Sequence, residues 1–208
     1  MFDIQTLIMF TTTSVLLGLA PGPDNIFVLT QSMLNGRKAG FFVTLGLCTG
    51  LIFHTLAVAL GVAVIFQTSA LAFAALKFVG AGYLLYLAVQ AFRAGNTEIS
   101  QGQKSDISLF SLYKKGVFMN ITNPKVSIFF LAFLPQFTDP GNGALPLQMV
   151  TLGFIFMLTT VVVFGSVSQL AGMIGTWFSK SRKAGIILNR TAGTVFAGLA
   201  VKLAFAER

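Results

Sequence analysis

The chain has 208 residues, of which 55% are hydrophobic and only 10% are charged. Soluble domains carry about 25% charged residues, so this composition excludes an ordinary soluble protein and favours a membrane protein built of helices. The net charge of +8 would suit a nucleic-acid partner, but the positions of the basic residues follow a membrane topology instead. No nucleic acid is therefore expected.

Six apolar segments follow one another along the chain, each long enough to cross a bilayer. Their expected ranges are 4–34, 41–66, 71–92, 116–137, 147–178 and 192–206. The first is broken at Pro21, Gly22 and Pro23 and the fourth at Asn123-Pro124, because proline lacks the N–H and clashes with the preceding turn. We therefore predict an all-α polytopic membrane protein with six transmembrane helices, of which helices 1 and 4 are broken.

The basic residues are concentrated in three of the five connecting segments. Segments 35–40, 93–115 and 179–190 contain or border two, four and four of the 14 Lys and Arg residues, and the other two segments contain none. Cytoplasmic loops carry the excess of positive charge, so these three segments are predicted to be cytoplasmic. With six spans, both termini are then expected outside.

The polar segment 93–115 divides a single transporter domain, 1–208, into two halves of three spans each. Repeat 1 covers about 1–92 and repeat 2 about 116–208. An odd number of spans in each half means that the halves insert with opposite orientation.

Sequence echoes between the halves support a duplication. At an offset of 113 residues Gly80 aligns with Gly193, and the breaks at Pro23 and Pro124 hold corresponding places in the two halves. We predict two inverted three-helix repeats with a transporter site at their interface. The alternative is two independent proline kinks, which membrane helices tolerate.

Three motifs lie near the N-terminus, in span 3 and in span 4. They read Gly18-Leu19-Ala20-Pro21-Gly22-Pro23-Asp24-Asn25, Gly80-Ala81-Gly82-Tyr83-Leu84 and Asn120-Ile121-Thr122-Asn123-Pro124-Lys125. Together they resemble the LysE/RhtB family of bacterial amino-acid exporters over essentially the whole chain. The resemblance implies efflux of amino acids or related metabolites across the cytoplasmic (inner) membrane, driven by the proton-motive force, and leaves the substrate open.

Asp24 and Lys125 directly follow the two breaks and hold equivalent positions with opposite charges. Charged residues inside spans are costly and usually functional. We predict that they form the substrate and proton site, either paired with each other or holding the two ends of a zwitterion. Free N–H groups after Pro23 and Pro124 are expected to face its carboxylate. Two alternatives stay open, that Asp24 caps the second half-helix and that Lys125 extends to the membrane surface.

Further polar residues in the spans complete the candidate site. Asn25, Asn120, Asn123 and Tyr83 offer hydrogen bonds to a ligand or between helices. His54 is the one histidine of the chain, and it serves either as a hydrogen-bonded packing residue or as a proton relay.

The expected partners are a small amino-acid substrate, protons and the lipid bilayer, and assembly into a homo-oligomer is left open. The sequence has no GxxxxGK[ST] loop, so neither a nucleotide nor another cofactor is expected. Metal export requires clustered His, Asp or Glu side chains. The expected spans contain only His54 and Asp24, so a metal site would lack ligands. We predict a secondary transporter and no enzyme, with a channel or metal-ion exporter as the alternative.

Overall fold

In the computed structural model, residues 2–62, 70–94, 107–180 and 182–205 are described, and they contain helices and no strand. The helices in chain order are α1 (Ile4–Leu19), α2 (Pro23–Asn35), α3 (Arg37–Ala57), η1 (Val58–Val62), α5 (Ala70–Arg93), α6 (Leu109–Thr122), α7 (Pro124–Ile128), η2 (Phe129–Phe133), η3 (Leu134–Phe137), η4 (Pro140–Asn142), α8 (Leu145–Lys180) and α9 (Arg182–Ala204). The all-α prediction is confirmed for this part of the chain.

Four stretches are by themselves long and apolar enough to cross a membrane, and they lie in α3 with η1, in α5, in α8 and in α9. The remaining apolar segments are bent pairs. Helices α1 and α2 meet at 61°, and α6 meets the segment Pro124–Phe137 at 50°. The described part of the chain therefore has four candidate spans, or up to six if each bent pair is one span. Both breaks lie where the prolines predicted them.

Several expected boundaries are wrong, because basic segments that the sequence predicts to be loops are helical. Only Gly36 separates α2 from α3, and its φ of 85° favours glycine. Helix α6 begins at Leu109, earlier than the expected start of span 4, and α8 and α9 together extend through most of 179–190. Lys and Arg are good helix formers, so hydropathy marks the hydrocarbon core and not the helix ends. The expected turn at 67–69 and most of the linker lie outside the described residues.

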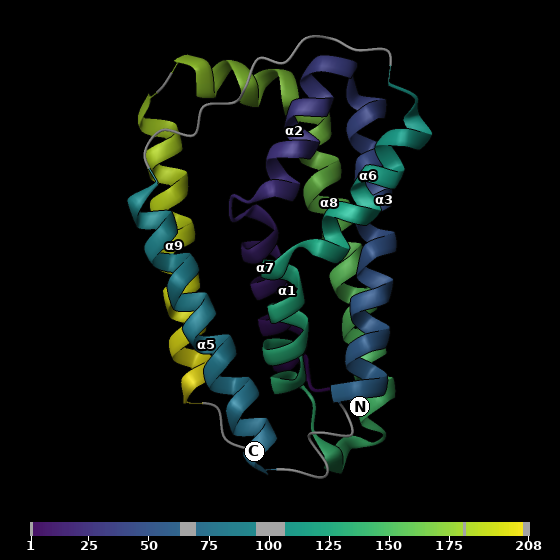
Figure 1. Cartoon of the computed structure of the whole chain (residues 1–208), viewed down its shortest axis with the longest axis vertical. Coiled ribbons are helices and arrows are strands. Elements are labelled where there is room, and N and C mark those ends of the chain that lie inside the picture. Colours follow the sequence, from purple (N-terminus) through teal and green to yellow (C-terminus); the bar gives the residue numbers. More distant parts are fainter. Residues whose placement is uncertain (1, 63–69, 95–106, 181, 206–208) are drawn as a thin grey trace.

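The helices form two groups (Figure 1). Helices α5 and α9 pack chiefly against each other along one side of the molecule, whereas α3 packs against α2, α6 and α8 on the other side. The two breaks lie between these groups, near mid-height. The start of α1 and the end of α9 lie at one end of the bundle, and the turns into α3 and α6 lie at the other.

Phenylalanine side chains fill the centre of the bundle below the second break. Phe129, Phe130 and Phe133 of the π-helical turn η2 are fully buried, and their rings lie 5.1–5.2 Å from that of Phe156 or from one another. Phe10 of α1 joins them. This close-packed cluster of aromatic rings supports the helix ends that surround the breaks.

Helices α3 and α6 run in the same direction with their backbones in contact. A Cβ added at Gly46 would lie 2.1 Å from the carbonyl oxygen of Tyr113, and one added at Gly116 would lie 2.5 Å from that of Val43. Small residues allow this approach between membrane helices. The Gly46-xxx-Gly50 pattern continues it, because Gly50 leaves room for the side chain of Asn120.

Gly46→Ala is expected to destabilise the protein, because its methyl group would push α6 away from α3. Overpacking of this kind costs about 1–3 kcal/mol, although alanine otherwise stabilises a helix by about 1 kcal/mol relative to glycine. The matched control is Gly165→Ala in α8, where a Cβ would meet nothing within 4 Å. Thermal unfolding in detergent should show a lower midpoint for Gly46→Ala alone, and equal midpoints would contradict the close contact.

Candidate functional site

The first break frees backbone carbonyls at the end of α1, and two side chains bond them. Pro21 has no N–H to give to the carbonyl of Leu17, and that oxygen instead accepts from Lys125 Nζ at 3.3 Å. The same ammonium donates to the carbonyl of Ala20 at 3.0 Å. The side-chain amide of Asn25 donates to the carbonyl of Gly18. The end of α1 is thus bonded to residues of α2 and α7.

The second break is built in the same way. Pro124 leaves the carbonyl of Asn120 without its helical partner, and this oxygen accepts from the N–H of Asn123 and lies 3.1 Å from His54 Nε2. Asn123 also caps α7, since its Oδ1 accepts from the N–H of Lys125 at 3.0 Å. In this way α3 and α6 meet at the start of α7.

The two charged side chains are both buried, Asp24 with 3% and Lys125 with 7% of its surface exposed. Asp24 Oδ2 accepts from the side-chain amide of Asn120 at 3.4 Å. The Lys125 ammonium turns to the α1 carbonyls, and the described residues hold no ion pair between it and Asp24. Gly22 lies beside this ammonium, because a Cβ there would be 3.0 Å from Nζ.

Three of the sequence-based expectations about these residues are wrong. Asp24 does not cap α2, because the N-cap is Gly22, which makes no side-chain cap bond, and the Asp24 carboxylate bonds Asn120. Lys125 does not reach the membrane surface, because its backbone is held at the break and its ammonium is bonded inside the protein. The amides at the start of α7 do not face a ligand carboxylate either, since those of Lys125, Val126 and Ser127 are bonded to Asn123.

Four polar atoms around the breaks are buried without a hydrogen-bond partner. Within the described part of the chain, these atoms are Asp24 Oδ1, Asn25 Oδ1, Asn120 Oδ1 and Asn123 Nδ2. Leaving such an atom unbonded costs about 1–3 kcal/mol, and it needs an explanation in a native structure. The four atoms together offer three acceptors and one donor at one place.

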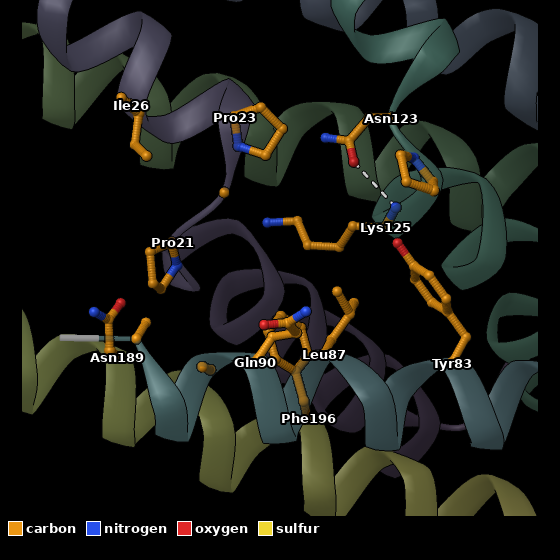
Figure 2. A pocket seen from close by; sticks show the side chains of 14 residues that line it. Pro21, Pro23, Ile26, Tyr83, Leu87, Gln90, Asn123, Lys125, Asn189 and Phe196 are labelled. Atoms are coloured by element: carbon orange, nitrogen blue, oxygen red, sulfur yellow. Dashed lines mark hydrogen bonds between the residues drawn. The ribbon is translucent and has the colours of Figure 1, made fainter. Parts of the chain in front are cut away.

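A cavity of about 560 Å³ lies between the breaks and the α5–α9 pair (Figure 2). Its size is within the usual range for small-molecule sites, about 300–1,000 Å³. The first break, the second break and the two helices all contribute to its lining, which comprises Pro21, Gly22, Pro23, Ile26, Tyr83, Leu87, Gln90, Ala91, Ala94, Asn123, Pro124, Lys125, Asn189 and Phe196. Lys125 extends along one wall, and the Tyr83 hydroxyl points toward that wall from α5.

A second, much smaller cavity of about 20 Å³ lies behind Lys125 and has room for about one water molecule. Asp24, Asn120 and Lys125 line it together with Thr160 of α8. Asp24 does not line the large cavity. Lys125 is the residue that the two linings share, so it lies between the large cavity and the small one that holds the carboxylate.

The chain is similar in sequence to known membrane proteins. The family model of the LysE type translocator matches residues 15–207. The chain belongs to this family. The translocator is 34% identical over 198 residues to a homoserine/homoserine lactone efflux protein of Salmonella typhimurium, covering 95% of each chain. It is also 30% identical over 205 residues to an uncharacterized membrane protein of Vibrio cholerae, covering 99% of each chain. No solved structure matches the chain.

In this LysE-type translocator most of the predicted site residues come together. Asp24, Asn25, Asn120, Asn123 and Lys125 surround the two breaks. Tyr83 faces the large cavity from α5. His54 Nε2 lies 3.1 Å from the backbone carbonyl oxygen of Asn120, and its ring lies 5.7 Å from that of Phe130. Among the described residues of the translocator, no group of three or more His, Cys, Asp or Glu side chains could hold a metal ion.

Two polar residues of the large cavity were missed by the sequence analysis, Gln90 of α5 and Asn189 of α9. A signal for Gln90 was present, because Tyr83, Leu87, Gln90 and Ala94 recur at helical spacing and mark one face of α5. Asn189 is a polar residue within a segment that was expected to be a loop. Once α9 is known to begin at Arg182, this residue falls within the helix and on the cavity wall.

Proposed function

We propose that this translocator is a secondary exporter that moves amino acids or closely related metabolites out of the bacterial cytoplasm in exchange for protons. The observation that carries the proposal is the position of Lys125. Its buried ammonium bonds the freed carbonyls of α1, faces the large cavity and separates it from Asp24. A substrate in the large cavity and a proton at Asp24 would both act on this one side chain.

The substrate binds in the large cavity with its carboxylate, or with the acyl oxygen of a lactone, at Lys125. The Asn123 amide nitrogen, buried and without a partner, donates to the same group, and Tyr83 orients it from α5. Attraction to the carboxylate draws the ammonium away from the carbonyls of Leu17 and Ala20. The large cavity then opens toward Asp24, whose free oxygen accepts a proton or the substrate's ammonium group. The name of the Salmonella relatives, which export homoserine and its lactone, supports this substrate class.

Such a transporter needs a site that can open to either side of the membrane. We therefore infer six spans arranged as two inverted repeats. Helices α5 and α9 run antiparallel, since Gly193 faces Phe92 while Gly80 faces Leu203. Each repeat also has a proline that frees a carbonyl four residues earlier. Broken helices in corresponding places are typical of transporters whose site lies between repeats. The repeats at about 1–92 and 116–208 then exchange roles as the site opens to either side.

The orientation follows from the ends of the helices. The basic ends of α3, α5 and α6 lie at the end of the bundle opposite to the start of α1 and the end of α9 (Figure 1). Basic residues mark the cytoplasmic side. The protein then resides in the inner membrane with both termini on its outer, periplasmic face.

The proposed function is tested with purified protein in lipid vesicles. Labelled homoserine inside the vesicles should leave faster when a pH gradient with the acidic side outside is imposed. The acceleration should disappear when a proton ionophore collapses the gradient. Protein-free vesicles are the control. Efflux that is unaffected by the ionophore would contradict proton exchange, and the absence of protein-dependent movement of any amino acid would contradict the exporter itself.

A further inference from the structure

The large cavity has one sign of charge. Among the residues that the structure describes in its lining, Lys125 is positively charged and none is acidic. Asp24, which follows the first break, lines the small cavity on the other side of Lys125. A ligand in the large cavity therefore meets a positive charge on one wall and uncharged groups on the others.

The wall formed by α5 and α9 is uncharged but polar. Gln90 rises from α5, with its side-chain nitrogen held by the hydroxyl of Tyr86 at 2.8 Å, which leaves its oxygen as an acceptor. Asn189, only 3% exposed, lies on α9 beside Pro21 (Figure 2). Leu87 and Phe196 supply the apolar surface of this wall. Such a wall suits a short side chain with a hydroxyl group or none.

We propose that Gln90 and Asn189 determine which substrates are accepted, and that they select amino acids with an uncharged side chain over basic amino acids of the same size. This inference rests on the proposed function and narrows its substrate class. A second cation in a cavity that already holds Lys125 is repelled and loses its water without gaining a counter-ion. Rejection of basic substrates thus follows from an unfavourable contact and not from lack of space.

The test compares two ligands of equal length. Homoserine ends in a hydroxyl group, whereas 2,4-diaminobutyrate carries an ammonium group at the same position at neutral pH. Each is used unlabelled to compete with labelled homoserine in exchange across vesicles that contain the wild-type protein. We expect at least tenfold weaker competition by 2,4-diaminobutyrate, equivalent to about 1.4 kcal/mol.

Variants then locate the discrimination. Gln90→Glu and Asn189→Asp each add an acid of nearly unchanged shape to the α5–α9 wall, and each should reduce the discrimination by about tenfold. Gln90→Met removes the amide without adding charge, so it should weaken homoserine binding yet still reject 2,4-diaminobutyrate. The control is Gln169→Glu in α8, which adds the same charge outside the cavity, beside Arg37, and should leave the ratio unchanged.

The outcomes separate this inference from the proposed function. Protein that exchanges homoserine and 2,4-diaminobutyrate equally well is an exporter without the proposed selectivity, and the inference is then overturned. Discrimination that survives both Gln90→Glu and Asn189→Asp, in variants that still exchange homoserine, would remove these residues as its cause. Failure of the wild type to move either ligand, together with every other amino acid, overturns the proposed function instead.

Discussion

Lys125→Met abolishes transport, with an expected loss of at least 100-fold in the rate of homoserine efflux per folded molecule. Methionine has nearly the same length as lysine but no charge and no N–H. The carbonyls of Leu17 and Ala20 would lose the donor that bonds them at the break. The large cavity would lose its cation at the same time. Both the binding of the substrate and the connection between the broken helices depend on this one ammonium.

Loss of folding must be distinguished from loss of function in this variant. Two buried carbonyls without donors cost about 1–3 kcal/mol each, so a lower unfolding temperature is expected, and the rate is normalised to monodisperse protein. Lys202→Met is the matched control, because Lys202 is exposed, its ammonium lies over the ring of Phe137, and it lines neither the large nor the small cavity. It should keep its rate within about twofold. If Lys125→Met kept the wild-type rate of efflux, Lys125 would not be part of the substrate site.

The breaks and the charges beside them could be predicted from the sequence because their causes are local. Proline lacks an N–H wherever it stands, so Pro21 and Pro124 fixed the two bends and the carbonyls that are freed. The identity of the groups that bond those carbonyls is a tertiary property. Nothing in the sequence near Leu17 indicates that an ammonium from α7 will reach its oxygen.

The cavity wall was harder to predict for a reason particular to membrane proteins. In a soluble helix the period of apolar residues marks the buried face. In this chain lipid covers the outer faces, and large apolar side chains such as Leu71 and Phe78 are exposed on α5. Hydropathy therefore does not distinguish the face toward the cavity from the face toward lipid, and only the scattered polar residues, Gln90 among them, carry that information.

Asp24→Asn is expected to abolish transport driven by the pH gradient while the protein still exchanges homoserine for homoserine. Asparagine keeps the shape of the side chain and an oxygen for the amide of Asn120, which Asp24 bonds at 3.4 Å, but it cannot release a proton. Gradient-driven efflux and exchange at equal pH are measured on the same vesicles. Asp139→Asn, in the turn before η4 where its carboxylate accepts from Gly141, is the control and should retain both activities.

The same variant tests whether Asp24 and Lys125 act as one unit across the small cavity that they share. Homoserine affinity is measured for Asp24→Asn, for Lys125→Met and for the double variant. With Lys125 removed, the Asp24 carboxylate is left buried without a nearby cation, and the double variant relieves this by removing the carboxylate as well. We therefore expect the loss in the double variant to be smaller than the sum of the single losses by more than about 0.5 kcal/mol, the limit within which independent sites add. Additive losses would mean that the two charges act separately, and proton binding at Asp24 would then need another route to the substrate.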